Sequence, residues 1–365
     1  MQKRTGVLLP AIFNFCIRIA PAQGNDLDAY VRQEMTTRKI PGLAFALVDH
    51  GKVITKRAYG SENLETGTPL GADGVFELAS VAKPFTATAI MMLVEKCKMG
   101  LDDPILKYIP DGPNAWKDIT VRQLLSHTSG LRGEGWVECD GSPLLYISKR
   151  RYFDDIAKAP LEFPPGEGGA YSDAGYFLLG MIIEKVSGMS YRRFMQERVF
   201  LPFGMTSSRI EDRRAIVKNH VSEYTLVNGQ LEQERRVWQH ELPSYYGVWS
   251  TVDDLVKWNT ALEEGRVVKP QTLALMWTPT KLKNGNVAKV DNIPYGLGWF
   301  VFDIAGHRVV AHPGFLGWAM FRYVDLHLTL ILLTNRDVEG GSFQVAIGQG
   351  IMTRIRADIP FFFNQ

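Results

Sequence analysis

The chain has 365 residues, of which 45% are hydrophobic and 22% are charged, a balance that suits a globular protein with a large core. Its 41 basic and 39 acidic residues give a formal net charge of +2, and neither sign forms a long run. This balance argues against nucleic acid or an anionic membrane as the main partner and leaves polar small molecules or peptides open.

The first 22 residues have the pattern of a secretory signal peptide. Lys3 and Arg4 precede the apolar stretch VLLPAIFNFCI, and Ala20-Pro21-Ala22 offers a small-x-small cleavage site. Asn14 interrupts this apolar run and Arg18 follows it directly, so a ragged N-terminal tail is the alternative. From this pattern we expect a secreted or periplasmic protein. No later stretch has about 18 uninterrupted apolar residues, so we expect no membrane span in the mature chain.

The cysteines and histidines do not form a metal-binding pattern. Cys16 would leave with the signal peptide, and Cys97 and Cys139 are either free thiols or a pair formed in an oxidising compartment. Neither has a second Cys or a His at zinc-ligand spacing, and HExxH is absent. We therefore expect no metal and no cofactor.

Strand-like segments lie at the two ends of the chain. Near the N-terminus, LAFALV is apolar on both faces, as a buried central strand should be, and His50-Gly51 forms a turn after it. Near the C-terminus, Leu326, Leu328 and Leu330 alternate with polar residues. The predicted strands span 43–48, 53–60, 295–303, 307–312 and 318–335. Strands at both ends with helices between them predict an α+β fold, in which both chain ends build one antiparallel sheet flanked by helices.

Helical patterns fill the middle of the chain and flank the strands. The segment that begins SVAKPFT carries Val81, Phe85 and Leu93 on one face, and we expect Gly100 to stop it. Ser250 or Thr251 is suited to cap a later helix. The predicted helices span 25–39, 80–97, 174–188, 190–200, 250–265 and 342–357. We expect a mostly helical lobe beside the sheet, with a ligand site in the crevice between them.

Ser80 and Lys83 lie three residues apart at the start of the second predicted helix. Residues with this spacing share one helix face, so the amine of Lys83 can reach the Ser80 hydroxyl. A serine nucleophile needs a base, and a buried lysine is suited to this role because burial lowers the pKa of its amine. The helix N-terminus would also favour a developing oxyanion. The same spacing arises by chance in many chains.

Two later segments could complete such a site. Tyr171 directly precedes a helix, and a phenol beside a lysine ammonium would have a lowered pKa and could relay a proton. His312, in HPGFLGW, lies between two predicted strands, where it could bind a substrate acyl or carboxylate group. Gly314 would let a substrate lie against the backbone. The ordinary alternatives are a helix-capping tyrosine and a turn histidine.

The motifs resemble those of a known family when they are read together. SVAKPFT, LLSHTSGL, YSDAGY, GVWSTVDDL, YGLGW and HPG occur in the order and spacing of the serine β-lactamase/penicillin-binding protein superfamily. The chain is most similar to the class C β-lactamase-like branch, which includes family VIII esterases, D-aminopeptidases and DD-peptidases. The resemblance covers roughly residues 25–357 and implies a β-lactamase/transpeptidase-like serine hydrolase domain there, with a signal peptide at 1–22 and a C-terminal tail at 358–365.

The resemblance also implies roles for individual residues. Ser80 matches the nucleophile that forms an acyl-enzyme, and Lys83 matches the lysine that assists its deprotonation. Tyr171 matches the tyrosine that relays a proton to the leaving group and then to the deacylating water. The backbone N–H groups of Ser80 and Phe315 would form the oxyanion hole. His127, in LLSHTSGL, matches a signature that we interpret as structural.

Two positions depart from the family pattern. The second motif is usually Tyr-x-Asn, but here Asp173 takes the place of the asparagine, which donates an N–H to a substrate amide. A carboxylate at this substrate-binding position can only accept hydrogen bonds unless it is protonated. The third motif has His312 where lysine is usual, and a mostly neutral histidine anchors a carboxylate less well. Both departures argue against an efficient β-lactamase.

The hypothesis that follows is a serine hydrolase that acts on small carboxylic esters through a Ser80 acyl-enzyme. A D-Ala-D-Ala carboxypeptidase, a D-aminopeptidase or a weak β-lactamase is the alternative. An acyltransferase would use the same residues, and a binding or scaffold protein would keep the fold without turnover. We expect the substrate contacts to come from 132–160 and 208–247. The oligomeric state has no signal in the sequence.

Overall fold

Seven strands from the two ends of the chain form the central antiparallel sheet of the structure, which is a computed structural model. The structure describes residues 23–132, 146–212, 214–234, 239–315, 317–337 and 343–359. The predicted signal peptide, Cys139 and part of the segments expected to contact substrate lie outside these residues. Across the sheet the strands are β13 (Phe300–Ile304), β14 (His307–Gly314), β15 (Trp318–Tyr323), β16 (Leu328–Thr334), β1 (Gly42–Asp49), β2 (Lys52–Asn63) and β3 (Thr68–Pro69).

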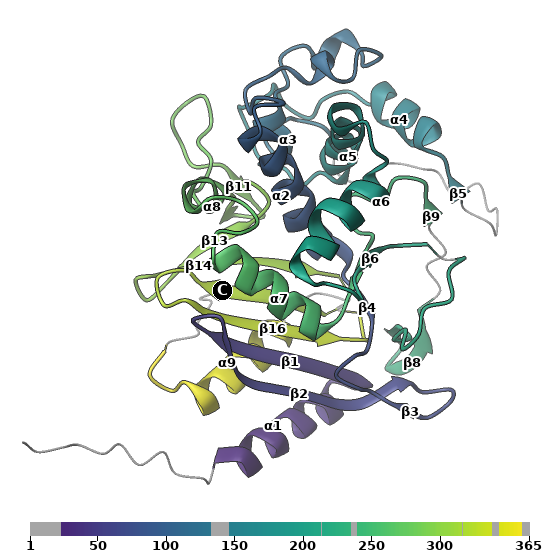
Figure 1. Cartoon of the computed structure of the whole chain (residues 1–365), viewed down its shortest axis with the longest axis vertical. Coiled ribbons are helices and arrows are strands. Elements are labelled where there is room, and N and C mark those ends of the chain that lie inside the picture. Colours follow the sequence, from purple (N-terminus) through teal and green to yellow (C-terminus); the bar gives the residue numbers. More distant parts are fainter. Residues whose placement is uncertain are drawn as a thin grey trace, which may run out of the picture.

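The junction between the two chain ends lies in the middle of this sheet. Strand β1 pairs antiparallel with β16, for example Leu47 with Leu330 and Ala46 with Ile331, and with β2 on its other side. The pairing confirms that both ends of the chain build one sheet. Figure 1 shows β1, β2 and β16 side by side below the helical lobe.

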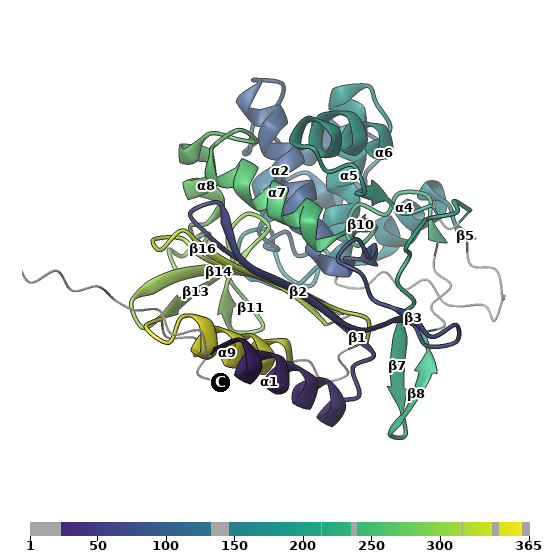
Figure 2. The same cartoon turned by 60° about the horizontal axis from the view of Figure 1, so that its bottom comes forward.

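Both faces of the sheet are covered, which explains why β1 is apolar throughout. Phe45 and Leu47 belong to the core under α1 (Gln23–Thr37) and α9 (Phe343–Ile355), whereas Ala44 and Ala46 face the core of the helical lobe. In Figure 2, α1 and α9 lie together below the sheet, and α7 (Val252–Glu263) lies above it. A strand that is covered on both sides needs apolar side chains at every position.

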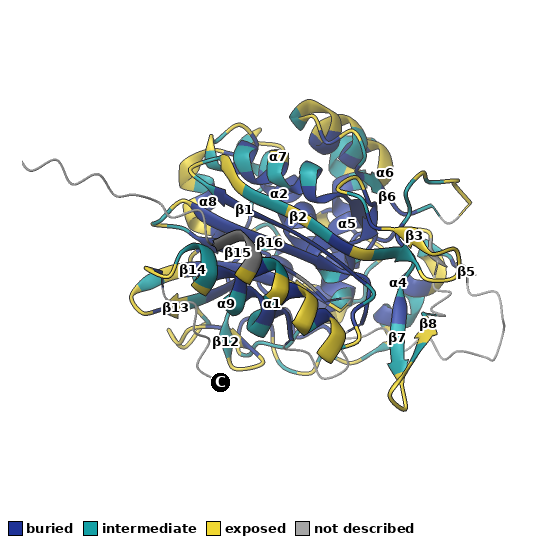
Figure 3. Ribbon diagram, turned by 90° about the horizontal axis from the view of Figure 1, so that it is seen from below, coloured by how far each residue is buried: buried dark blue, intermediate teal, exposed yellow. Residues whose placement is uncertain are grey.

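The helical lobe contains the remaining helices, with α2 in its core. Almost every residue of α2 is buried (Figure 3), so our expectation of a single apolar face was too narrow. The helices of the lobe are α2 (Ala82–Glu95), α3 (Val121–Leu125), α4 (Lys149–Lys158), α5 (Asp173–Ser187), α6 (Tyr191–Phe194), α7 and α8 (Pro270–Met276), and α6 continues as a π-helical segment over Met195–Phe200. The predicted helices did not include α3, α4 or α8.

Short strand pairs connect the lobe to the sheet. Strand β4 leads directly into the turn before α2, and it pairs with β10, which leads into α7. The short strands are β4 (Phe76–Glu77), β5 (Tyr146–Ile147), β6 (Arg209–Ile210), β7 (Tyr224–Val227), β8 (Gln230–Gln233), β9 (Gln239–His240), β10 (Val248–Ser250), β11 (Lys289–Val290) and β12 (Ile293–Pro294). No helix among the described residues is both long and apolar enough to cross a bilayer.

Helix ends follow the chemistry of capping, with one correction. Thr251 accepts a hydrogen bond from Asp254 N and caps α7 as expected, and Gly188 ends α5 with a φ of 70°. Helix α2, however, ends well before Gly100. Cys97 takes the left-handed conformation with a φ of 52°, and Lys98 N donates to the Leu93 carbonyl, which closes the last turn.

Two predicted strands are shorter than the sequence pattern indicated. The segment 318–335 breaks into β15 and β16 because 324–327 form a turn in which His327 has a φ of 50°. The alternation of Leu326, Leu328 and Leu330 is therefore not the pattern of one half-exposed strand, and β16 is buried on both faces. The segment 295–303 enters its strand only at Phe300, after a turn at Gly298.

We predict that Gly298→Ala destabilises the protein more than the matched change Gly306→Ala. Both glycines have a left-handed φ, of 88° and 84°, so both substitutions strain the backbone by about 1–2 kcal/mol. A Cβ atom at Gly298 would also lie 2.5 Å from the Cβ of Ala87 in α2, whereas nothing lies within 4 Å of one at Gly306. Denaturant unfolding should show an additional loss of about 1–3 kcal/mol for Gly298→Ala, and equal losses would contradict this packing.

Candidate active site

Ser80 lies on a tight turn between β4 and α2. Its neighbour Ala79 has a φ of 43°, in the left-handed region that non-glycine residues rarely adopt, and Ala79–Val81 form one 3₁₀ turn before the helix begins. Non-glycine residues held in such conformations occur often at functional sites. The turn brings the hydroxyl of Ser80 within 3.3 Å of the amine of Lys83, which lies in the first turn of α2.

The amine of Lys83 is buried and has several oxygen partners. The residue has no exposed surface, and its Nζ lies 3.1 Å from the carbonyl oxygen of Tyr245 and 2.6 Å from Oδ1 of Asp173, in addition to Ser80. An ammonium group would donate to the oxygens of Ser80 and Tyr245 and form an ion pair with the carboxylate of Asp173. A neutral amine would donate to the Tyr245 carbonyl and direct its lone pair at the Ser80 hydroxyl, which is the arrangement a base requires.

Tyr171 and Asp173 reach Lys83 from the start of α5. The amine of Lys83 lies 4.6 Å from the centre of the Tyr171 ring, and Asp173 is the first residue of the helix. Ser172 caps α5 by accepting a hydrogen bond from Gly175 N at 3.1 Å. The cap fixes the turn between Tyr171 and Asp173, so the local sequence YSDAG positions both side chains.

His127 contacts the segment that carries Tyr171 and Asp173. It is 1% exposed, its Nδ1 accepts a hydrogen bond from Ser172 N at 3.1 Å, and its carbonyl accepts one from Ala170 N at 3.0 Å. Burial, followed by the charge of Lys83, lowers the pKa of His127 well below its ordinary value, so the ring is neutral. These contacts are those of a buried loop histidine, as the sequence predicted.

His312 lies on β14 with both ring nitrogens bonded to protein atoms. Its Nδ1 donates to the carbonyl of Pro313 at 2.8 Å, and its Nε2 therefore accepts from the hydroxyl of Tyr295 at 3.1 Å. Burial and the charge of Lys83 lower the pKa of His312 to about 3. The structure brings the His312 ring to 6.2 Å from that of Tyr171, but substrate binding by His312 stays a prediction.

The residues after His312 lie at the end of the same strand. Gly314 is the last residue of β14 and pairs with Trp318, and Phe315 follows it with 40% of its surface exposed. Strand β14 packs beside the 3₁₀ turn that carries Ser80. This proximity is what an oxyanion hole made by the backbone N–H groups of Ser80 and Phe315 requires, and the hole itself stays a prediction.

Sequence reasoning missed three contributions to the site. Tyr245 contributes a backbone carbonyl, for which any residue type would serve, so the sequence carried no signal. Tyr295 contributes the hydroxyl that fixes His312, and the motif YGLGW contained it without indicating that role. The ion pair between Lys83 and Asp173 was also missed, because Asp173 was interpreted only as a substrate contact.

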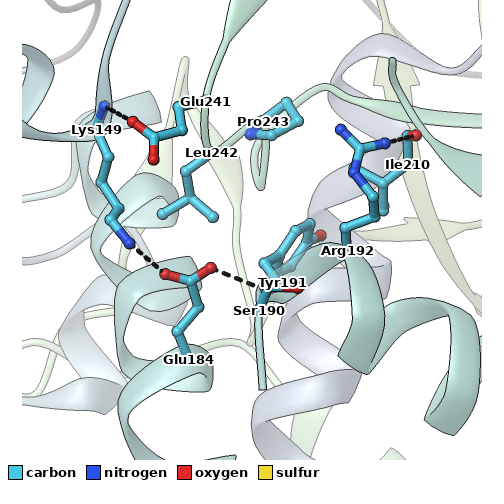
Figure 4. Close-up of a pocket in the computed structure, with 9 residues that line it drawn as sticks. All are labelled: Lys149, Glu184, Ser190, Tyr191, Arg192, Ile210, Glu241, Leu242 and Pro243. Atoms are coloured by element: carbon cyan, nitrogen blue, oxygen red, sulfur yellow. Dashed lines mark hydrogen bonds and ion pairs between the residues drawn. The ribbon is translucent and has the colours of Figure 1, made fainter. Parts of the chain in front are cut away.

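A separate hollow of about 210 Å³ lies between α4, α5 and α6 (Figure 4). Neither Ser80 nor Lys83 lines it. Lys149 donates from Nζ to Glu184 at 2.7 Å and from its backbone N to Glu241 at 2.8 Å, and the backbone N of Tyr191 donates to Glu184 at 3.0 Å. Arg192 donates to two backbone carbonyls. Because these charged groups bind one another or the backbone, we assign the hollow a structural role.

Comparison with known proteins identifies the family of the chain. The family model described as Beta-lactamase matches residues 27–349, and the chain belongs to this family. It is 32% identical over 318 residues to penicillin-binding protein 4* of Bacillus subtilis, which covers 81% of this chain and 68% of the relative. Esterase EstB of Burkholderia gladioli is 28% identical, with 90% of this chain and 95% of the relative covered. A D-aminopeptidase of Brucella anthropi is 27% identical, with 92% and 65% covered.

Solved structures share the fold. The octameric penicillin-binding protein homologue from Pyrococcus abyssi superposes with a TM-score of 0.78 at 25% identity, covering 90% of this chain and 76% of the other. EstCE1, described as a hydrolase with promiscuous acyltransferase activity, has the same TM-score at 22% identity and covers 91% and 98%. The chain therefore has the fold of a family whose relatives include esterases, peptidases and penicillin-binding proteins.

We predict that His312→Gln makes the free energy of unfolding less dependent on pH in acid. Folded His312 titrates near pH 3, whereas an unfolded histidine titrates near 6.5, so between these values the unfolded chain binds the extra proton. Stability is therefore lost as the pH falls from about 6.5 towards 3, by up to about 1.4 kcal/mol per pH unit for this residue. Urea unfolding across this range should show a shallower slope in the variant, and parallel curves would contradict a neutral buried His312.

Proposed function

We propose that the protein is a serine hydrolase that forms an acyl-enzyme on Ser80 and acts on small carboxylic esters. The observation that carries the proposal is the buried amine of Lys83, 3.3 Å from the Ser80 hydroxyl. A buried amine with fixed acceptors for its N–H groups is suited to take a proton from Ser80 and to return it later. Esterase EstB, a relative at 28% identity, supports the same reaction class.

In the proposed reaction, the oxygen of Ser80 attacks the ester carbonyl while its proton passes to Lys83. The tetrahedral intermediate then collapses, the carbon–oxygen bond to the alcohol breaks, and the alcohol leaves with a proton from the Lys83–Tyr171 pair. Water attacks the acyl-enzyme in the same way and releases the carboxylic acid and free Ser80. Backbone N–H groups of Ser80 and Phe315 would stabilise the negative oxygen in both steps.

The choice of esters over amides and β-lactams is supported by the two departures from the family pattern. Asp173 carries no N–H to donate to a substrate amide, and neutral His312 carries no charge to anchor a carboxylate. A D-aminopeptidase, with one relative at 27% identity, is the second candidate, because a carboxylate beside the nucleophile suits an amino group. Transfer of the acyl group to an acceptor other than water would use the same residues.

We also propose that residues 1–22 act as a signal peptide, through which the protein is exported.

We predict that Ser80→Ala lowers turnover of short p-nitrophenyl esters by more than about 10³-fold, because the acyl-enzyme can no longer form. A fluorescent fluorophosphonate should label the unmodified protein and not this variant. The matched control is Ser190→Ala, which removes a serine hydroxyl at the N-cap of α6, outside the proposed site, and should be labelled like the unmodified protein.

Nitrocefin and a D-Ala-D-Ala peptide, assayed beside the esters, test the order of preference. Faster turnover of the peptide than of every ester would contradict the esterase assignment. Labelling that persists in Ser80→Ala would contradict the assignment of the nucleophile.

A further inference from the structure

A second hollow lies between the end of α7, helix α8 and the strands β14 and β15. Its volume is about 220 Å³, and none of the residues of the candidate active site lines it. Figure 2 shows α7 and α8 on the same face of the sheet. Leu262, Leu273 and Trp277 give the hollow apolar walls, and Arg308 and Arg322 line it from the strands. We call this space the α7–α8 hollow.

Arg322 brings a permanent positive charge to the α7–α8 hollow. Its side chain is 4% exposed, and a guanidinium group stays protonated even when it is buried. One N–H donates to Oδ1 of Asn259 at 2.7 Å, and the guanidinium carbon lies 5.1 Å from the centre of the Trp277 ring. Within the described part of the chain, Nε of Arg322 is buried and has no hydrogen-bond partner. An unpaired buried donor costs about 1–3 kcal/mol, which a bound acceptor would recover.

The other polar groups of the hollow do not compensate this charge fully. Oε2 of Glu263 lies 3.6 Å from the Arg322 guanidinium, too far for a hydrogen bond, and Oε1 is bound to Nδ1 of His327 at 2.9 Å. Arg308 is exposed and has no ion pair with any described residue, so a second cation lines the hollow where it meets solvent. The buried indole N–H of Trp277 also has no hydrogen-bond partner among the described residues. Two guanidinium groups therefore face one carboxylate.

We propose that the α7–α8 hollow binds a small organic anion, a monocarboxylate with an apolar body. The carboxylate would accept charge-assisted hydrogen bonds from Arg322 and Arg308. Its carbon chain or ring would pack against Leu262, Leu273 and Trp277, which a purely polar anion such as phosphate would leave in contact with water. The hollow is smaller than the roughly 300–1,000 Å³ of sites for drug-sized molecules, so the ligand is small. The proposal is independent of the hydrolysis proposed above.

The test titrates the full chain with 4-fluorobenzoate and, in parallel, with the neutral 4-fluorobenzamide, followed by the fluorine NMR line width of each compound. The two compounds differ in charge and have nearly the same shape. We expect saturable binding of the carboxylate that is about tenfold tighter than that of the amide, because charge-assisted hydrogen bonds are roughly twice as strong as neutral ones. Inorganic phosphate should displace the carboxylate only weakly, and equally strong binding of phosphate would overturn the need for an apolar body.

Variants test whether the anion lies in the α7–α8 hollow. Arg322→Gln removes the buried charge and should weaken binding of 4-fluorobenzoate by about tenfold or more. Two exposed lining positions cover the case in which this variant does not fold. Arg308→Gln should weaken binding by about threefold or more, and Ala274→Phe should abolish it by filling the hollow. The matched control is Arg57→Gln, which changes an exposed arginine of β2 on the far side of the sheet and should leave the affinity unchanged.

Three results would overturn the proposal. The first is the absence of saturable 4-fluorobenzoate binding at about 10 mM, a concentration at which even weak sites fill. The second is equal affinity for the carboxylate and the amide. The third is binding that Arg308→Gln and Ala274→Phe both leave unchanged, because the anion would then lie elsewhere on the protein.

Discussion

The buried amine of Lys83 is the group around which the two lobes of the protein are organised. A charged amine without exposed surface is costly unless opposite charge and acceptors surround it. Its partners come from separate parts of the chain: Ser80 from the turn before α2, Asp173 from the start of α5, and the Tyr245 carbonyl from the segment before β10. These partners meet only when the helices of the lobe pack correctly against one another, so the fold and the site depend on the same contacts.

Two histidines and two tyrosines around the site are held neutral, and Asp173 is the charged partner of Lys83. Burial and the charge of Lys83 lower the pKa of both His127 and His312. Burial raises the pKa of Tyr245 and of Tyr295 well above the ordinary value, and nearby negative charge, including that of Asp173, adds to the effect. These neutral groups strengthen the electrostatic interaction between Lys83 and Asp173. They also limit the routes by which a proton can move.

The sequence predicted those features that depend on local patterns. The apolar run of β1, the Thr251 cap and the terminal Gly188 each follow from backbone and solvent requirements that a few neighbouring residues express. The motifs around Ser80 and Tyr171 indicated a shared site because their order matched a known family. Contacts that depend on packing could not be predicted in this way. The sequence across the turn between β15 and β16 has the alternating pattern of one continuous strand. The Tyr245 carbonyl is a backbone group that any residue type would supply, so the sequence does not mark it.

We infer that Asp173 controls whether Lys83 can act as the base for Ser80, and the pH dependence of acylation is the sharpest test of this control. Single-turnover acylation of Ser80 by a p-nitrophenyl ester should be measured across pH in the unmodified protein and in Asp173→Asn. Removing the carboxylate charge destabilises the Lys83 ammonium, so we expect the acid limb of the rate profile to move to lower pH by about one unit or more. Acid limbs at the same pH in both proteins, with only the amplitude changed, would contradict it.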